Sequence, residues 1–214
     1  EDGLPEGYSL HTSRNTIGYA AMFAKVYRDG TRFENQEARE ASSSMGIFVD
    51  VFPYDRLYVD KRLRAKQVRT ASIAQKRAYL YHSSSIVVPH KGLLGQLEQI
   101  GCSAIHVVER LVSQGACSYQ DLFDSCIADS NTGEVSDCCL TLSWPNMAPV
   151  SISDLFPLSS AVFEGIEFPV PHKTEKYLTT MYGDWKKIPS PDNRHTHLPL
   201  LLDFGDGEVW TVQN

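Results

Sequence analysis

The chain has 214 residues, 42% of them apolar, and a formal net charge of −6. This length and composition predict a soluble globular protein of one large or two small domains, with enough residues for a substantial core. The sequence contains no run of about 18 apolar residues, so no membrane-spanning helix is predicted. The acidic balance, without a recognition motif, argues against nucleic acid as a partner.

The first residues, EDGLPEGYSL, contain neither a starting Met nor the basic-then-apolar pattern of a signal peptide. They favour a chain that begins inside a longer protein. Residues 16–29, TIGYAAMFAKVYRD, predict a strand or short helix that ends at a turn, where Gly30 can adopt a positive φ.

Residues 46–55, GIFVDVFPYD, form the clearest predicted strand. Asp50 is its unusual member, because an unpaired carboxylate is costly to bury among apolar side chains. In one interpretation Asp50 faces solvent while Ile47, Val49 and Val51 face the core, an alternation that would leave two phenylalanines exposed beside it. In the other interpretation Asp50 lies beside a cation or a metal ion.

Residues 56–114 are mostly helical in pattern, with a break in the segment SSSIVVPHKG at Pro89 and Gly92, and Asp55 is placed to cap the first helix. Residues 61–77 concentrate positive charge without an acid. This segment is either a solvated helix face or a surface for an anionic membrane or glycan. Its basic residues are Lys61, Arg62, Arg64, Lys66, Arg69, Lys76 and Arg77.

Residues 127–144 predict a β-hairpin with its turn at 131–133. Residues 163–185, FEGIEFPVPHKTEKYLTTMYGDW, predict a second hairpin that turns at Gly165, followed by a helix from Thr174 to Tyr182.

The five cysteines include no CxxC pair. Their odd number favours a reducing, cytoplasmic setting over a disulfide framework. Zinc binding is the lesser alternative, because these spacings do not predict four ligands.

Three phrases in order resemble the LicD family of phosphotransferases, to which fukutin and fukutin-related protein are distantly similar. They are GIFVDVFPYD, then LFPLSSAVFEGIEFPVPHKTEKYLTTMYGDW, then PSPDNRHTH with its Arg-x-x-His of Arg194 and His197. The resemblance covers most of the chain and is loosest over about 56–150.

The resemblance implies an α/β (α+β) fold of the nucleotidyltransferase type, with a small mixed sheet flanked by helices. It would be a single catalytic domain, 1–214, with a variable and mostly helical insertion at 56–150. It also implies transfer of phosphocholine, ribitol phosphate or a related group from a CDP-activated donor to a cell-surface polysaccharide or teichoic acid. The expected location is the cytoplasm, or the inner face of the membrane through residues 61–77.

The family's aspartate cluster, a motif such as PWDDDID, should precede LPEGYSL and is absent from this sequence. The chain is therefore expected to lack its main metal-binding carboxylates. Asp50 matches the family's third carboxylate, which implies a role as a ligand of Mg²⁺ or Mn²⁺ or as the base that deprotonates the acceptor hydroxyl.

Three further residues are candidates for substrate binding. Lys25 matches the family's lysine before the central strand and would stabilise phosphate charge. Arg194 would hold a phosphate through two hydrogen bonds, and His197 would donate a hydrogen bond or a proton. In the alternative interpretation Lys25 is an ordinary surface lysine, and Arg194 and His197 only brace the C-terminal loop. Two other functions stay open, namely a catalytically inactive fragment or scaffold and a glycan-binding module.

Overall fold

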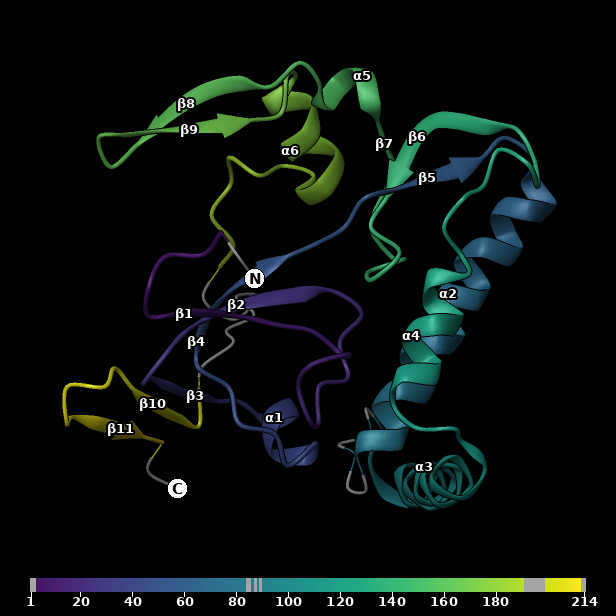
Figure 1. The fold of residues 1–214 in the computed structure, drawn as a ribbon, viewed down its shortest axis with the longest axis vertical. Coiled ribbons are helices and arrows are strands. Elements are labelled where there is room, and N and C mark those ends of the chain that lie inside the picture. Colours follow the sequence, from purple (N-terminus) through teal and green to yellow (C-terminus); the bar gives the residue numbers. More distant parts are fainter. Residues whose placement is uncertain (1–2, 84–85, 87, 89, 191–198, 213–214) are drawn as a thin grey trace. The chain divides into compact units, whose positions relative to one another are not determined.

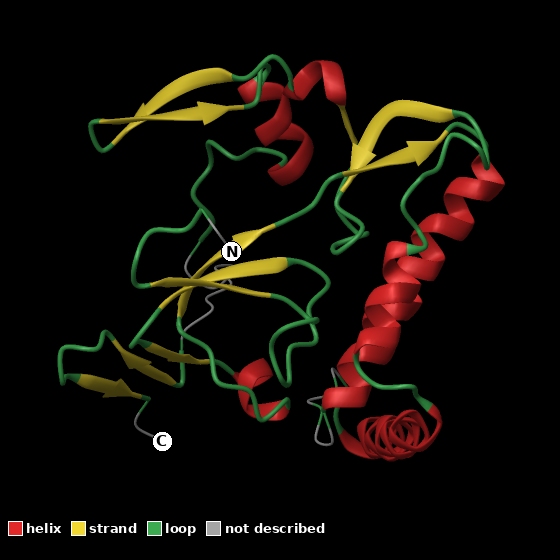
Figure 2. Ribbon diagram, viewed as in Figure 1, coloured by secondary structure: helices red, strands yellow, loops and turns green. Residues whose placement is uncertain are grey.

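The computed structural model describes residues 3–83, 86, 88, 90–190 and 199–212. The chain divides into two compact units. Unit 1 comprises Glu1–Phe52, Ser72–Ser125 and Thr196–Asn214, and unit 2 comprises Pro53–Ala71 and Cys126–His195. Figure 1 labels the elements along the chain, and Figure 2 separates helices from strands by colour.

The described residues form an α+β protein, so the predicted fold class is confirmed. The helices are α1 (Gln36–Glu40), α2 (Lys61–His82), α3 (Gly92–Val112), α4 (Cys117–Asp124), α5 (Ile152–Leu155) and α6 (Thr174–Tyr182). The strands are β1 (Tyr8–His11), β2 (Ala24–Arg28), β3 (Arg32–Glu34), β4 (Ile47–Val51), β5 (Asp55–Tyr58), β6 (Val135–Leu140), β7 (Val150–Ser151), β8 (Ser159–Phe163), β9 (Ile166–Val170), β10 (Leu201–Asp203) and β11 (Val209–Thr211).

Unit 1 contains two three-stranded sheets, in the orders β1-β2-β4 and β11-β10-β3. Its buried side chains include Tyr19, Met22, Tyr27 and Ala38. Every strand pair in the described part of the chain is antiparallel. The mixed pairing expected of a nucleotidyltransferase-like sheet is therefore not among these pairs, and that specific fold stays a prediction.

Unit 2 is built around the sheet β5-β6-β7 and the hairpin β8-β9. Leu57 and Leu142 are almost fully buried in it, and each contributes about 2 kcal/mol by its removal from water. The predicted turn at Gly165 is confirmed, because Glu164 and Gly165 both have positive φ and join β8 to β9 in a two-residue turn. The helix predicted from Thr174 to Tyr182 is also confirmed as α6.

The predicted break between two long helices is confirmed, since α2 ends at His82 and α3 begins at Gly92. Segment 56–150 contains α2, α3 and α4 together with most of β5 and all of β6. Its status as an insertion within a single domain stays a prediction. None of the helices in the described residues is long and apolar enough to cross a membrane.

Two local predictions are wrong. The 131–133 turn does not join a hairpin, because β6 pairs with β5 and β7; Asn131 instead donates its amide N–H to the Asp129 carboxylate. Asp55 lies in β5 and does not cap α2. Asp60 does so, since its carboxylate accepts the backbone N–H groups of Arg62 and Leu63 at 2.9 Å.

Candidate functional site

The sheet β1-β2-β4 of unit 1 places three polar residues in one cross-strand row. His11 pairs with Lys25 across β1 and β2, and Lys25 pairs with Asp50 across β2 and β4. Residues directly opposite in antiparallel strands project from the same face of the sheet. The structure therefore brings two of the predicted site residues, Lys25 and Asp50, side by side.

The Lys25 and Asp50 side chains form an ion pair, with Lys25 Nζ 2.7 Å from Asp50 Oδ1. The lysine side chain is 11% exposed and the aspartate 32% exposed, so the cation is the more buried partner. Lys25 Nζ also lies 3.5 Å from the centre of the Phe48 ring, within the range of a cation–π contact. Asp50 is accommodated in an apolar strand because a buried ammonium group lies against it.

This arrangement decides between the two interpretations of the strand and excludes the one in which Ile47, Val49 and Val51 together face the core. Val49 and Val51 are exposed, whereas the opposite face of β4 carries Phe48 and Asp50 toward Lys25. The alternation of the strand is as predicted, but the packed face is the one that contains the carboxylate. The physical reason is that aromatic rings and an ion pair together fill that face.

Each member of the ion pair retains hydrogen-bonding capacity. Asp50 Oδ1 is the only acceptor that Lys25 Nζ has among the described residues, although an ammonium group carries three N–H donors. Asp50 Oδ2 accepts no hydrogen bond from a described side chain or backbone group. The pair can therefore bind a further anionic or hydroxyl group without losing its own contact.

His11 belongs to this row and was not predicted from the sequence. Its ring stacks on Tyr27, with ring centres 3.8 Å apart. Its Nδ1 lies 2.8 Å from the Thr16 hydroxyl, and its Nε2 lies 2.9 Å from the Ser9 hydroxyl. Burial lowers the pKa of His11, against a smaller opposing effect of Asp29. The only sequence signal was the short alternation YSLH, which is weak by itself.

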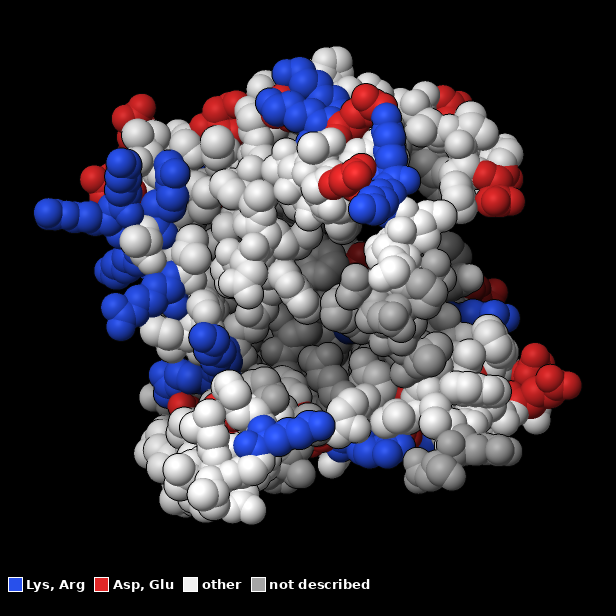
Figure 3. All heavy atoms as spheres, turned by 180° about the vertical axis from the view of Figure 1, so that it is seen from behind, with Lys and Arg blue, Asp and Glu red and all other residues white. Residues whose placement is uncertain are grey.

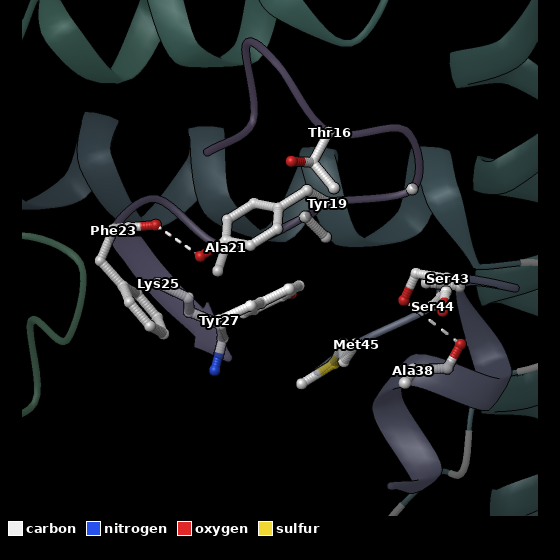
Figure 4. Close-up of a pocket in the computed structure, with 13 residues that line it drawn as sticks. Thr16, Tyr19, Ala21, Phe23, Lys25, Tyr27, Ala38, Ser43, Ser44 and Met45 are labelled. Carbon is white, nitrogen blue, oxygen red and sulfur yellow. Dashed lines mark hydrogen bonds between the residues drawn. The ribbon is translucent and has the colours of Figure 1, made fainter. Parts of the chain in front are cut away.

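A cavity of about 40 Å³ adjoins Lys25 within unit 1. Figure 4 shows Tyr19 and Tyr27 along one side of it and Met45 opposite. Tyr19 is held in place by a hydrogen bond from its hydroxyl to the Phe23 carbonyl at 2.8 Å. The cavity has room for about three water molecules and is far smaller than a typical nucleotide pocket. A nucleotide therefore does not fit inside this cavity.

Arg194 and His197 lie outside the described residues. The basic segment 61–77 lies in α2, and Figure 3 shows a run of Lys and Arg side chains along the edge where this helix lies. Two of its arginines have protein partners. Arg64 donates to the Tyr58 carbonyl, and Arg77 pairs with Glu109. The remaining basic residues are exposed: Lys61, Arg62, Lys66, Arg69 and Lys76.

The metal assigned to Asp50 needs more donors than the structure describes. No group of three His, Cys, Asp or Glu side chains suited to a metal ion occurs in the described ranges. Asp50 brings one free carboxylate oxygen and a neighbouring ammonium group, whereas Mg²⁺ prefers six oxygen donors. These residues alone do not fit a complete Mg²⁺ site. All five cysteines lie among the described residues and are free thiols.

Comparison of the chain with protein-family models, with curated proteins and with solved structures finds no match.

Proposed function

We propose that this chain contributes the donor-phosphate site of a LicD-like phosphotransferase. The group transferred would be phosphocholine, ribitol phosphate or a similar unit, carried from a CDP-activated donor to a hydroxyl of a cell-surface glycan or teichoic acid. One observation carries the proposal. Lys25 and Asp50, which the resemblance selects from segments 25 residues apart, meet in register with a separation of 2.7 Å.

Lys25 is assigned the role of phosphate ligand. Its ammonium group is held in place by Asp50 and the Phe48 ring, and its remaining N–H donors are suited to phosphate oxygens. A fixed cation near the phosphate stabilises the charge that develops there during transfer. Because the ammonium group is largely buried, its attraction for a phosphate is less screened than that of a surface lysine.

Asp50 is assigned to the acceptor hydroxyl or to a metal. Its Oδ2 atom can accept a proton or a hydrogen bond from a hydroxyl placed at the open side of the pair. The same atom can contribute one oxygen to a Mg²⁺ ion whose other ligands come from the donor and from further carboxylates. Arg194 and His197 remain proposed contacts of the donor phosphates, and α2 remains a proposed contact of an anionic membrane surface.

Calorimetric titration of CDP-choline and CDP-ribitol, each with and without Mg²⁺, tests the proposal. We expect Lys25→Met and Asp50→Asn to weaken donor binding at least tenfold, or about 1.4 kcal/mol. Unit 2 offers a control Lys–Asp pair, in which Lys173 Nζ lies 2.8 Å from Asp154 Oδ1, the aspartate is the more buried partner, and Asp154 also binds Lys176. Lys173→Met and Asp154→Asn should leave donor binding unchanged.

The titration should be repeated with a chain extended by any residues that its gene encodes upstream. Absence of donor binding by both folded chains would contradict the proposal and favour an inactive scaffold. Equal losses in the Lys25 and Lys173 variants would also contradict it, because the effect would not be specific to the site. Sugar binding that needs neither CDP nor metal would point instead to a glycan-binding module.

A further inference from the structure

Helix α3 turns its polar side toward its own unit. His90 Nδ1 lies 2.6 Å from Glu98 Oε1, and His106 Nδ1 lies 2.7 Å from the Leu80 carbonyl. Glu109 is buried and binds Arg77. Glu98, His106 and Glu109 follow one another at intervals of eight and three positions and share one side of the helix. The ordinary arrangement, with an apolar stripe against the core, is reversed in α3.

The opposite side of α3 is apolar and exposed. It carries nine large aliphatic side chains, each at least 45% exposed: Leu93, Leu94, Leu97, Ile100, Ile105, Val107, Val108, Leu111 and Val112. Taking roughly 100 Å² for each fully exposed aliphatic side chain, these fractions amount to on the order of 550 Å² of apolar surface. A monomeric protein rarely exposes a larger apolar patch without a partner.

The spacing of this face matches the seam of a coiled coil. Along its centre the residues follow one another at intervals of 4, 3, 4, 3 and 4, in the order Leu93, Leu97, Ile100, Ala104, Val107 and Leu111. This is the heptad pattern by which one helix packs against another. No charged residue interrupts the seam, because Glu98 and Glu109 are on the inward side.

We infer that α3 pairs with α3 of a second copy of this chain in an antiparallel, two-fold symmetric dimer. The seam is symmetric about residue 102, so one two-fold axis at that point brings every seam residue opposite another. Leu93 would pack against Leu111 of the second copy, Leu97 against Val107, and Ile100 against Ala104. Such a self-complementary patch is what a two-fold interface requires.

The sizes of these residues also suit close pairing. The exposed Gly101 and Ala104 lie near the axis, where two helices must approach most closely, and the large leucines lie toward the ends. Two such faces together expose on the order of 1,100 Å² of apolar surface, an upper limit for the buried area that lies near the lower end of stable protein interfaces. A membrane surface is the less favoured occupant, because the exposed side lacks the many flanking Lys and Arg residues of an interfacial helix.

The full-length chain should be analysed by sedimentation over a concentration series. We expect a mass of twice 23.9 kDa at high concentration. Leu97→Glu would place a carboxylate in the seam and reduce the mass to that of the monomer. Ile17→Glu is the matched control, because Ile17 is 98% exposed in the same unit and outside α3, and it should remain dimeric.

The orientation of the helices has its own test. Leu111→Glu and Leu93→Lys should each be monomeric alone. An equimolar mixture should form a mixed dimer, because the carboxylate introduced in one chain then faces the ammonium group introduced in the other. Parallel helices would not recover dimers in this mixture. Because the substituted side chains are exposed in the monomer, circular dichroism should show that every variant is folded.

Three results would overturn the inference. The first is a folded wild-type chain that stays monomeric at all concentrations, including one that binds anionic vesicles as a monomer. The second is a Leu97→Glu variant that stays dimeric. The third is a mixture of Leu111→Glu and Leu93→Lys that stays monomeric.

Discussion

Two of the ion pairs in unit 1 differ in which partner is buried. In the Lys25–Asp50 pair the lysine side chain is 11% exposed and the acid 32% exposed. In the Arg77–Glu109 pair the acid is 9% exposed and the arginine 42% exposed. Removing the more exposed partner of a pair leaves a buried charge behind. The more costly removal is therefore that of the acid, Asp50, in the first pair and that of the base, Arg77, in the second.

The pairs also differ in how completely they are hydrogen-bonded. Glu109 accepts Arg77 Nε at 2.8 Å, Arg77 Nη2 at 3.1 Å and the Tyr119 hydroxyl at 2.8 Å. Lys25 and Asp50 share one hydrogen bond. A carboxylate with both oxygens bound has a structural role, whereas a pair with free donors and acceptors can bind a ligand. This difference supports placing the candidate site at Lys25 and not at Glu109.

The largest effect is expected for Arg77→Met. It leaves the buried Glu109 carboxylate with Tyr119 alone, which should lower the free energy of unfolding by about 3 kcal/mol, the lower end for a broken buried pair because Arg77 is partly exposed. Urea unfolding measures the change. The neighbouring Lys76→Met, at an exposed position of the same helix, should stay within about 0.5 kcal/mol. Equal effects of the two variants would refute the assignment.

In the Lys25–Asp50 pair, removal of the acid should cost more free energy of unfolding than removal of the base. Asp50→Ala leaves a buried ammonium group without its acceptor and should cost about 2 kcal/mol. Lys25→Met should cost less than about 1 kcal/mol, because water can reach Asp50 and the methionine can pack on Phe48. Urea unfolding of both variants tests this order. A greater loss of free energy of unfolding in Lys25→Met than in Asp50→Ala would show that the unpaired buried charge does not set the cost.

Tyr119→Phe should have a smaller effect. The change removes one of the three hydrogen bonds that Glu109 accepts, and it should lower the free energy of unfolding by about 1 kcal/mol. Thermal unfolding followed by circular dichroism would detect it. Tyr8→Phe, at an exposed tyrosine of the same unit, is the control and should be close to neutral. Identical unfolding of wild type and Tyr119→Phe would exclude a contribution from this hydroxyl.

The smallest effect concerns pH. The hydrogen bonds from Arg77 lower the pKa of Glu109 despite its burial, with help from Tyr119. Because the folded-state pKa lies below that of the unfolded chain, the stabilisation is complete above the unfolded pKa and is lost as the pH falls through the folded pKa. Unfolding of wild type should therefore depend more steeply on pH in the acid range than unfolding of Glu109→Gln. Parallel pH profiles of the two proteins would disprove this.

Local features of the fold could be predicted because neighbouring residues determine them. The strand Ile47–Val51, the hairpin turn at Gly165 and the helix Thr174–Tyr182 depend on alternation, positive φ and capping within a few residues. The β-hairpin predicted around residues 131–133 was wrong for a complementary reason. Its segment forms a local turn, but the partners of β6 are β5 and β7, which pattern alone does not select.

Part of the candidate site could also be predicted. The family resemblance selected Lys25 and Asp50 separately, but strand register brought them together with His11. The sequence left open which face of β4 packs, because alternation defines two faces without saying which is covered; the structure supports the interpretation in which Asp50 lies beside a cation. Arg194 and His197 lie outside the described residues, so their assignments stay predictions.

The sequence by itself determined the strand Ile47–Val51, the hairpin turn at Gly165, the helix Thr174–Tyr182 and the break between the two long helices. It also determined the basic character of α2 and the apolar heptad spacing of α3. Only the tertiary structure decided that Lys25 lies against Asp50, that Glu109 binds Arg77 and Tyr119, and that α3 presents its apolar side outward. The physical reason is that secondary structure follows from contacts between near neighbours. Ion pairs and buried faces depend on which residues distant in sequence come into contact. Strand register and helix packing determine those contacts.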